Sequence, residues 1–181
     1  MKRFLMIVSA LVVVLMIGGC AMIPPKQHIE VLPKTKFVVV GKVETFKDSK
    51  EGIKESRIYI KDMGEQTNDP SYVELANTYS VVFKEELKKN GFEVLDKHEN
   101  QIPALIINTK LGYMSPIFLI RYGTIMAQTE VIQNGKLIFS FDEAVVVTGL
   151  PFKTLPDFAT SMKRVIAPRV AKKIKECCFL E

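Results

Sequence analysis

The chain has 181 residues, of which 48% are hydrophobic and 25% are charged, and this composition excludes disorder over the whole length. Its 25 basic and 20 acidic residues give a formal net charge of +5, which falls to +3 if Lys2 and Arg3 are removed with a leader. So small an excess gives no support to a nucleic-acid-binding function. We therefore expect one compact domain together with processing and linker segments.

The amino terminus is typical of a secretory leader. Lys2 and Arg3 provide a positive start, and the apolar run 4–17 that follows them is 14 residues long. A helix of this length is several residues too short to span a bilayer, so we expect a signal peptide rather than a permanent transmembrane anchor.

The sequence Ile17-Gly18-Gly19-Cys20 follows this run directly. It resembles the lipobox of bacterial lipoproteins, in which an aliphatic residue and two small residues precede the modified cysteine. The resemblance implies cleavage between Gly19 and Cys20 and attachment of lipid, such as palmitate, to Cys20. Ala21 comes next, where an aspartate marks inner-membrane retention in enteric bacteria, so the resemblance implies the outer membrane, or the cell membrane of a single-membrane bacterium. The alternative is an ordinary apolar helix that happens to end in these residues.

Residues 21–35 contain three prolines and show no periodicity, so we interpret them as an extended tether. Fifteen residues at about 3.1 Å each reach roughly 45 Å. The predicted organisation is a signal peptide over 1–19, the lipidated cysteine and tether over 20–35, and one domain over 36–181.

The first half of this domain predicts a strand over 37–46 and an amphipathic helix over 71–89. Asn90-Gly91 supplies the left-handed stop that helices favour, and a short strand is expected over 92–95. Between the first strand and the helix, the polar stretch 47–70 is interpreted as a long exposed insertion in which only 57–61 could form a short strand.

The second half predicts strands over 104–113, 120–133 and 136–148. Asn134-Gly135 joins the last two and is a strong hairpin signal, because both turn positions tolerate a positive φ. A last amphipathic helix is expected over 158–177, with a kink or break at Pro168, which removes a backbone donor.

These elements predict an α+β fold, with a mostly antiparallel sheet of four to five strands and two amphipathic helices on one face. The order β-α-β-β-β-β-α, and the helix end 85–95 followed by 104–109, resemble small periplasmic lipoprotein modules. These include the amino-terminal domain of TolB, the lipopolysaccharide-assembly lipoprotein LptE, and the YajG and CsgG-like lipoproteins. These groups share no catalytic motif, so the resemblance carries over no functional residue and implies an assembly or transport role only by analogy of fold.

The chain contains no nucleophile elbow, phosphate-binding loop or dinucleotide fingerprint. His28 and His98 lie far apart in tether and turn segments, which gives poor metal geometry, so we predict neither a metal nor a cofactor, and no enzyme. Cys177 and Cys178 are adjacent in the last helix. We interpret Cys177 as core filler, while free thiols or intermolecular pairing stay open.

Two surfaces are candidates for binding. The last helix carries six basic residues opposed only by Glu176 between 163 and 176, and this face either is simply solvated or attracts lipopolysaccharide or anionic lipid. The six are Lys163, Arg164, Arg169, Lys172, Lys173 and Lys175. The sheet face without helices is the second candidate, with one strand presenting Tyr122, Thr124, Gln128 and Glu130. Asp142 and Glu143 follow on the next strand and must point to opposite faces, so they cannot form an acid–base pair; Asp142 could face a partner.

The function that these observations favour is a membrane-anchored, non-catalytic module that binds a protein partner in an outer-membrane or transport complex. The alternative is binding of an anionic envelope ligand through the basic helix.

Overall fold

The computed structural model describes residues 34–97, 102–114, 122–148 and 155–178. The chain divides into two units, Met1–Val31 and Leu32–Glu181, and all of the described residues belong to the second unit. The elements are β1 (Phe37–Lys47), β2 (Lys50–Lys54), β3 (Arg57–Asp62), β4 (Glu65–Gln66), α2 (Pro70–Lys89), β5 (Glu93–Leu95), β6 (Leu105–Met114), β7 (Tyr122–Gln133), β8 (Lys136–Thr148), α3 (Leu155–Ser161), a π-helical turn (Met162–Ile166) and α4 (Ala167–Cys178).

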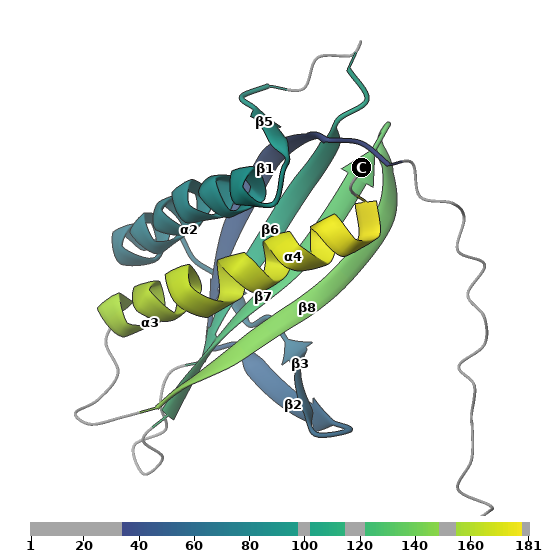
Figure 1. Cartoon of the computed structure of the whole chain (residues 1–181). Helices are drawn as coiled ribbons and strands as arrows, with labels where there is room; N and C mark the ends of the chain where they lie inside the picture. Colours follow the sequence, from purple (N-terminus) through teal and green to yellow (C-terminus); the bar gives the residue numbers. More distant parts are fainter. Residues whose placement is uncertain (1–33, 98–101, 115–121, 149–154, 179–181) are drawn as a thin grey trace, which may run out of the picture. The chain divides into compact units, whose positions relative to one another are not determined.

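Six strands form the main sheet, in the order β4-β1-β6-β7-β8 with β5 also paired to β1. The strands β6, β7 and β8 are antiparallel neighbours, whereas β1 runs parallel to β5 and β6. Parallel neighbours need a crossover connection, and α2 provides it between β1 and β5. The helices α2, α3 and α4 all lie on one face of this sheet (Figure 1). The predicted α+β class is confirmed, with a mixed sheet.

The β7–β8 hairpin forms where Asn134-Gly135 predicts it. Asn134 and Gly135 have φ values of 51° and 74°. Positive φ at both central positions defines the turn type whose twist matches that of the flanking strands. The hairpin therefore fixes the register of the two longest strands of the sheet.

Helix α2 ends at the predicted stop signal and begins with an N-cap. The Asp69 carboxylate accepts a hydrogen bond of 2.9 Å from the Ser71 backbone N–H, and Pro70 occupies the first turn. Gly91 follows the helix with a φ of 96°, the left-handed conformation that glycine adopts at low cost. The apolar face of the helix is buried against the sheet through Leu75, Ala76, Tyr79, Phe83 and Leu87.

The last helix passes Pro168 through a π-helical turn. The Ala167 N–H donates to the Met162 carbonyl, five residues earlier, instead of to a carbonyl four residues earlier. A wider turn just before Pro168 accommodates a residue that has no N–H and whose ring would press on the preceding turn. The predicted disturbance at Pro168 thus takes the form of a π-turn, after which the helical path continues as α4.

Aromatic rings fill the layer between the helices and the sheet. The rings of Tyr79 and Phe83 stack with centroids 5.3 Å apart, and Tyr113 meets Phe158 of α3 edge-on at 5.8 Å. Burial raises the pKa of both tyrosines well above its usual value.

The stretch 47–70 is mostly exposed and 57–61 lies in a strand, as predicted, but the prediction that only 57–61 could form a strand is wrong. Strands β2 and β3 form an antiparallel hairpin across this stretch, and β4 pairs with β1. The hairpin turn uses Glu55 and Ser56, with φ values of 51° and 61°, where a glycine or asparagine is usual. Because neither residue is a turn former, the turn has no recognisable sequence signal.

Candidate functional surfaces

The predicted lipidation site, Gly19 and Cys20, and both histidines lie outside the described residues. The described part begins with the last two residues of the predicted tether, where the Thr35 N–H donates a 3.1 Å hydrogen bond to the Cys178 carbonyl. The chain therefore enters the domain beside the last turn of α4. Within the described ranges, no helix is long and apolar enough to cross a membrane.

Two of the predicted cations hold α4 against the sheet. Glu143 of β8 points toward the helices, and its side chain is only 13% exposed. The Lys173 ammonium contacts its Oε1 atom, and Arg169 Nη1 lies 3.9 Å from its Oε2 atom. Lys173 Nζ also lies 5.0 Å from the centroid of the Phe141 ring. These two cations therefore have a structural role that the helical pattern did not predict.

The remaining cations are all exposed. Lys172 Nζ lies 3.7 Å from the Glu176 carboxylate one turn along the helix, in an exposed pair. Lys175 is exposed. Lys163 and Arg164 belong to the π-turn, are exposed, and form no ion pair with any other residue that the structure describes. The predicted basic face is thus divided, and its least neutralised part is the π-turn.

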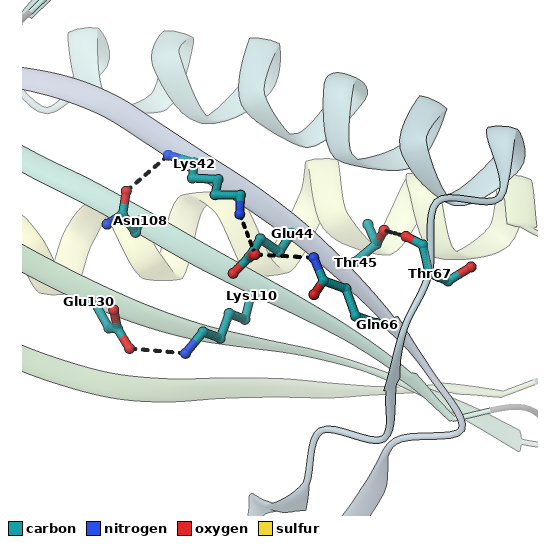
Figure 2. A network of polar contacts seen from close by, with 8 residues as sticks. All are labelled: Lys42, Glu44, Thr45, Gln66, Thr67, Asn108, Lys110 and Glu130. Carbon is teal, nitrogen blue, oxygen red and sulfur yellow. Dashed lines mark hydrogen bonds and ion pairs between the residues drawn. The ribbon is translucent and has the colours of Figure 1, made fainter.

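A polar network covers part of the sheet face opposite the helices (Figure 2). Glu44 accepts from Lys42 at 2.6 Å and from Gln66 Nε2 at 3.2 Å. Lys110 pairs with Glu130 across β6 and β7 at 3.2 Å. Since each of these charges already has an opposite partner, this part of the face is satisfied without a ligand.

The predicted binding residues on β7 fall into different environments. Thr124 is completely buried, and its hydroxyl donates a 2.7 Å hydrogen bond to Glu51 of the β2–β3 hairpin. The prediction that Thr124 faces a partner is therefore wrong, because the hairpin folds over this end of the sheet. Gln128 and Glu130 are half-buried on the uncovered part, and the side chain of Tyr122 lies outside the description.

Asp142 and Glu143 point to opposite faces of the sheet, as their adjacent positions on a strand require. Asp142 lies opposite Gln128 on the face without helices, whereas Glu143 faces α4. The two carboxylates therefore act separately, and only Asp142 lies on a face that a partner could reach.

The β2–β3 hairpin has two unlike sides. Its strand register pairs Lys54 with Arg57 and Gly52 with Tyr59 on one side. Glu51, on the other side, bonds to the sheet, so the first side faces away from the sheet. A Cβ atom on Gly52 would lie 2.4 Å from the Tyr59 ring, so the glycine allows the ring to lie across the ribbon.

The side of the hairpin that faces away from the sheet is mostly cationic. We call it the hairpin outer face and define it by the exposed residues Lys50, Lys54, Arg57, Tyr59 and Lys61. Sequence reasoning missed this surface. The alternation of Arg57, Tyr59 and Lys61 was the available signal, but it required a partner strand to show which side faces outward.

The two carboxy-terminal cysteines are both free thiols. Cys178 is fully buried, and burial, together with the adjacent Cys177, raises the pKa of its thiol. Cys177 is partly buried and packs against the core, in keeping with its interpretation as core filler. No group of three or more His, Cys, Asp or Glu side chains among the described residues could hold a metal ion.

Several solved structures have a similar chain path at low sequence identity. A Xanthomonas campestris protein described as DUF330 matches with a TM-score of 0.46 and 10% identity, over 82% of this chain and 89% of that one. A minor lipoprotein from Acinetobacter baumannii matches with a TM-score of 0.42 and 11% identity, over 78% and 90%. The rare lipoprotein B from Shewanella oneidensis matches with a TM-score of 0.34 and 15% identity, over 75% and 92%. No protein-family model and no curated protein sequence matches the chain.

Proposed function

We propose that the chain is a bacterial envelope lipoprotein, cut before Cys20 and held to a membrane by lipid on that residue. The observation that carries this proposal is the sequence Ile17-Gly18-Gly19-Cys20 directly after a positively charged start and a 14-residue apolar run. Several acyl chains on one residue give stable membrane attachment, because each buried methylene adds about 0.8 kcal/mol. The outer membrane, with the domain in the periplasm, is the proposed destination, since Ala21 follows the cysteine.

The anchored α+β domain is a non-catalytic module that binds a protein partner in an envelope assembly or transport complex. A tether of up to roughly 45 Å would let the domain reach partners beyond the membrane surface. Several ionisable groups described above pair with one another. Lys173, Arg169 and Glu143 brace a helix, while Lys110 and Glu130 satisfy each other on an open face.

Anchoring is tested by replacing Cys20 with serine in the full chain and labelling cells with palmitate. Wild type should be labelled and processed, whereas Cys20→Ser should be unlabelled and migrate as a precursor. Cys177→Ser is the matched control, because it removes a thiol from the domain and should keep the label. Equal processing of wild type and Cys20→Ser, with label in neither, would contradict the proposal.

Partner binding is tested by affinity purification from crosslinked cells that express the wild-type chain or Cys20→Ser. The wild type should recover a defined protein that the unanchored variant recovers much less, because the anchor concentrates the domain near its partner. Recovery of no protein above background would count against a binding module.

The second candidate function is binding of an anionic envelope ligand, lipopolysaccharide or anionic lipid, through the basic last helix. Exposure of Lys163 and Arg164 without a described carboxylate partner favours this function at the π-turn. Reversal of both residues to glutamate should weaken binding to anionic vesicles and to lipopolysaccharide, whereas Lys173→Met should weaken it much less, since Lys173 already contacts Glu143. Unchanged vesicle binding by the double reversal would remove this candidate.

A further inference from the structure

The β2–β3 hairpin offers a second cationic surface besides the last helix. We infer that the hairpin outer face is the surface through which the domain binds an acidic surface of its protein partner. This inference rests on the proposed protein-binding function and names the part of the domain that performs it.

The charge of the hairpin outer face is largely uncompensated. Lys54, Arg57 and Lys61 are exposed, and none of them forms an ion pair with another residue in the described ranges. Lys50 lies 3.7 Å from Asp62, in a pair whose side chains are 69% and 54% exposed. Solvent screens such a pair strongly. Residues 50–62 carry four basic and three acidic residues, but the four cations define the hairpin outer face, so a surface rich in Asp and Glu would meet positive charge there.

The same region exposes apolar and aromatic groups beside the cations. Tyr59 lies in the middle of the hairpin outer face and is 40% exposed, and Ile53 near the hairpin tip is 75% exposed. Tyrosine and arginine are enriched among the residues that dominate binding energy at protein interfaces. Arg57 and Tyr59 therefore suit a protein surface better than charge alone would, whereas Ile53 pairs with Ile58 on the other side of the ribbon.

The hairpin is held in place at its base and along its inner side. The Ser49 hydroxyl donates to the Met63 carbonyl, which closes the base of the hairpin. Glu51 accepts from the buried Thr124 hydroxyl of β7. A surface that is fixed before binding loses little conformational entropy when a partner docks.

The hairpin lies at one end of β1, opposite to the point where the chain enters the domain. The chain enters the domain at Thr35, before β1, and leaves β1 for the hairpin only after Lys47. Eleven residues of strand separate the two ends by about 33 Å, so the hairpin and Thr35 lie at opposite ends of β1 (Figure 1).

The test places a photo-crosslinking amino acid in the full-length, membrane-anchored chain in cells, either at Tyr59 or at Val81. Val81 lies on the outer side of α2 and is 60% exposed, so it reports on the helix layer. We expect Tyr59 to crosslink a defined protein through a segment rich in Asp and Glu. Lys54→Glu with Arg57→Glu should reduce this crosslink at least fivefold, and Asp/Glu→Lys changes in the crosslinked segment should restore it.

Lys88→Glu with Lys97→Glu is the matched control, because it makes the same charge change at two exposed lysines outside the hairpin and should leave the crosslink intact. Cellular level and thermal unfolding of both double variants confirm that they fold.

A protein crosslink at Val81 but none at Tyr59 would leave the binding function standing and overturn the hairpin assignment. No protein crosslink at either position would contradict the binding function itself. Crosslinking of Tyr59 only to lipid or lipopolysaccharide, or a crosslink unchanged by the double reversal, would also overturn the assignment.

Discussion

Glu143 is the residue whose replacement tests most directly how the last helix is held. Glu143→Gln keeps the size of the side chain but removes the charge that meets Lys173 and Arg169. A hydrogen bond to a charged group contributes about 1.5–3 kcal/mol, and the two cations are 40% and 57% exposed, which places the loss near the lower end. We expect the free energy of unfolding to fall by about 1–2 kcal/mol.

In a domain of this size such a loss lowers the melting temperature by roughly 3–6 °C. Urea unfolding and thermal unfolding followed by circular dichroism measure both quantities. Glu176→Gln is the control, because its pair with Lys172 is 62% and 73% exposed and should contribute under about 0.5 kcal/mol. If Glu143→Gln were as stable as Glu176→Gln, Glu143 would not brace the helix, and Lys173 and Arg169 would be available to a ligand.

The other predictions concern close packing, pH and thiol reactivity. Gly123→Ala should lower the free energy of unfolding by about 1–3 kcal/mol in urea titration, because its Cβ would lie 2.7 Å from the Phe158 ring; wild-type stability would show that the ring moves freely. Burial raises the pKa of Tyr79, so the stability that its protonated hydroxyl contributes is fully present below about pH 10 and is lost above it, at up to about 1.4 kcal/mol per pH unit. Tyr79→Phe should therefore reduce the fall of the free energy of unfolding at alkaline pH. An unchanged slope of that free energy against pH would exclude Tyr79 as its source. In the native protein iodoacetamide should modify Cys177 well before the buried Cys178, as mass spectrometry of digests will show, and equal rates would contradict the described helix end.

Several elements could be predicted from the sequence because their signals are local. Asn134-Gly135 specifies a hairpin turn, and Asp69 and Gly91 flank a helix whose apolar residues recur every three or four positions. These signals need no knowledge of the rest of the chain. The β2–β3 hairpin could not be predicted in the same way, since its turn residues, Glu55 and Ser56, adopt positive φ values only because the flanking strands pair.

In the candidate surfaces, too, the sequence predicts local features, whereas the contacts depend on residues far away in the chain. The sequence located the six cations of the last helix, but their partners come from elsewhere in the chain. Glu143 neutralises Lys173 and Arg169 from a strand that precedes the helix. In the same way, Thr124 has the pattern of an exposed strand residue until Glu51, from a distant hairpin, covers it.

By itself the sequence determined most strands and helices and the α+β class, because apolar periodicity and turn chemistry act over a few neighbouring residues; the leader with its lipobox stays a prediction. Only the tertiary structure decided that β1 lies parallel to β6, that the hairpin covers one end of the sheet, and which cations are free to meet a partner. Those properties depend on pairing between residues tens of positions apart, and such pairing leaves no periodic trace along the chain.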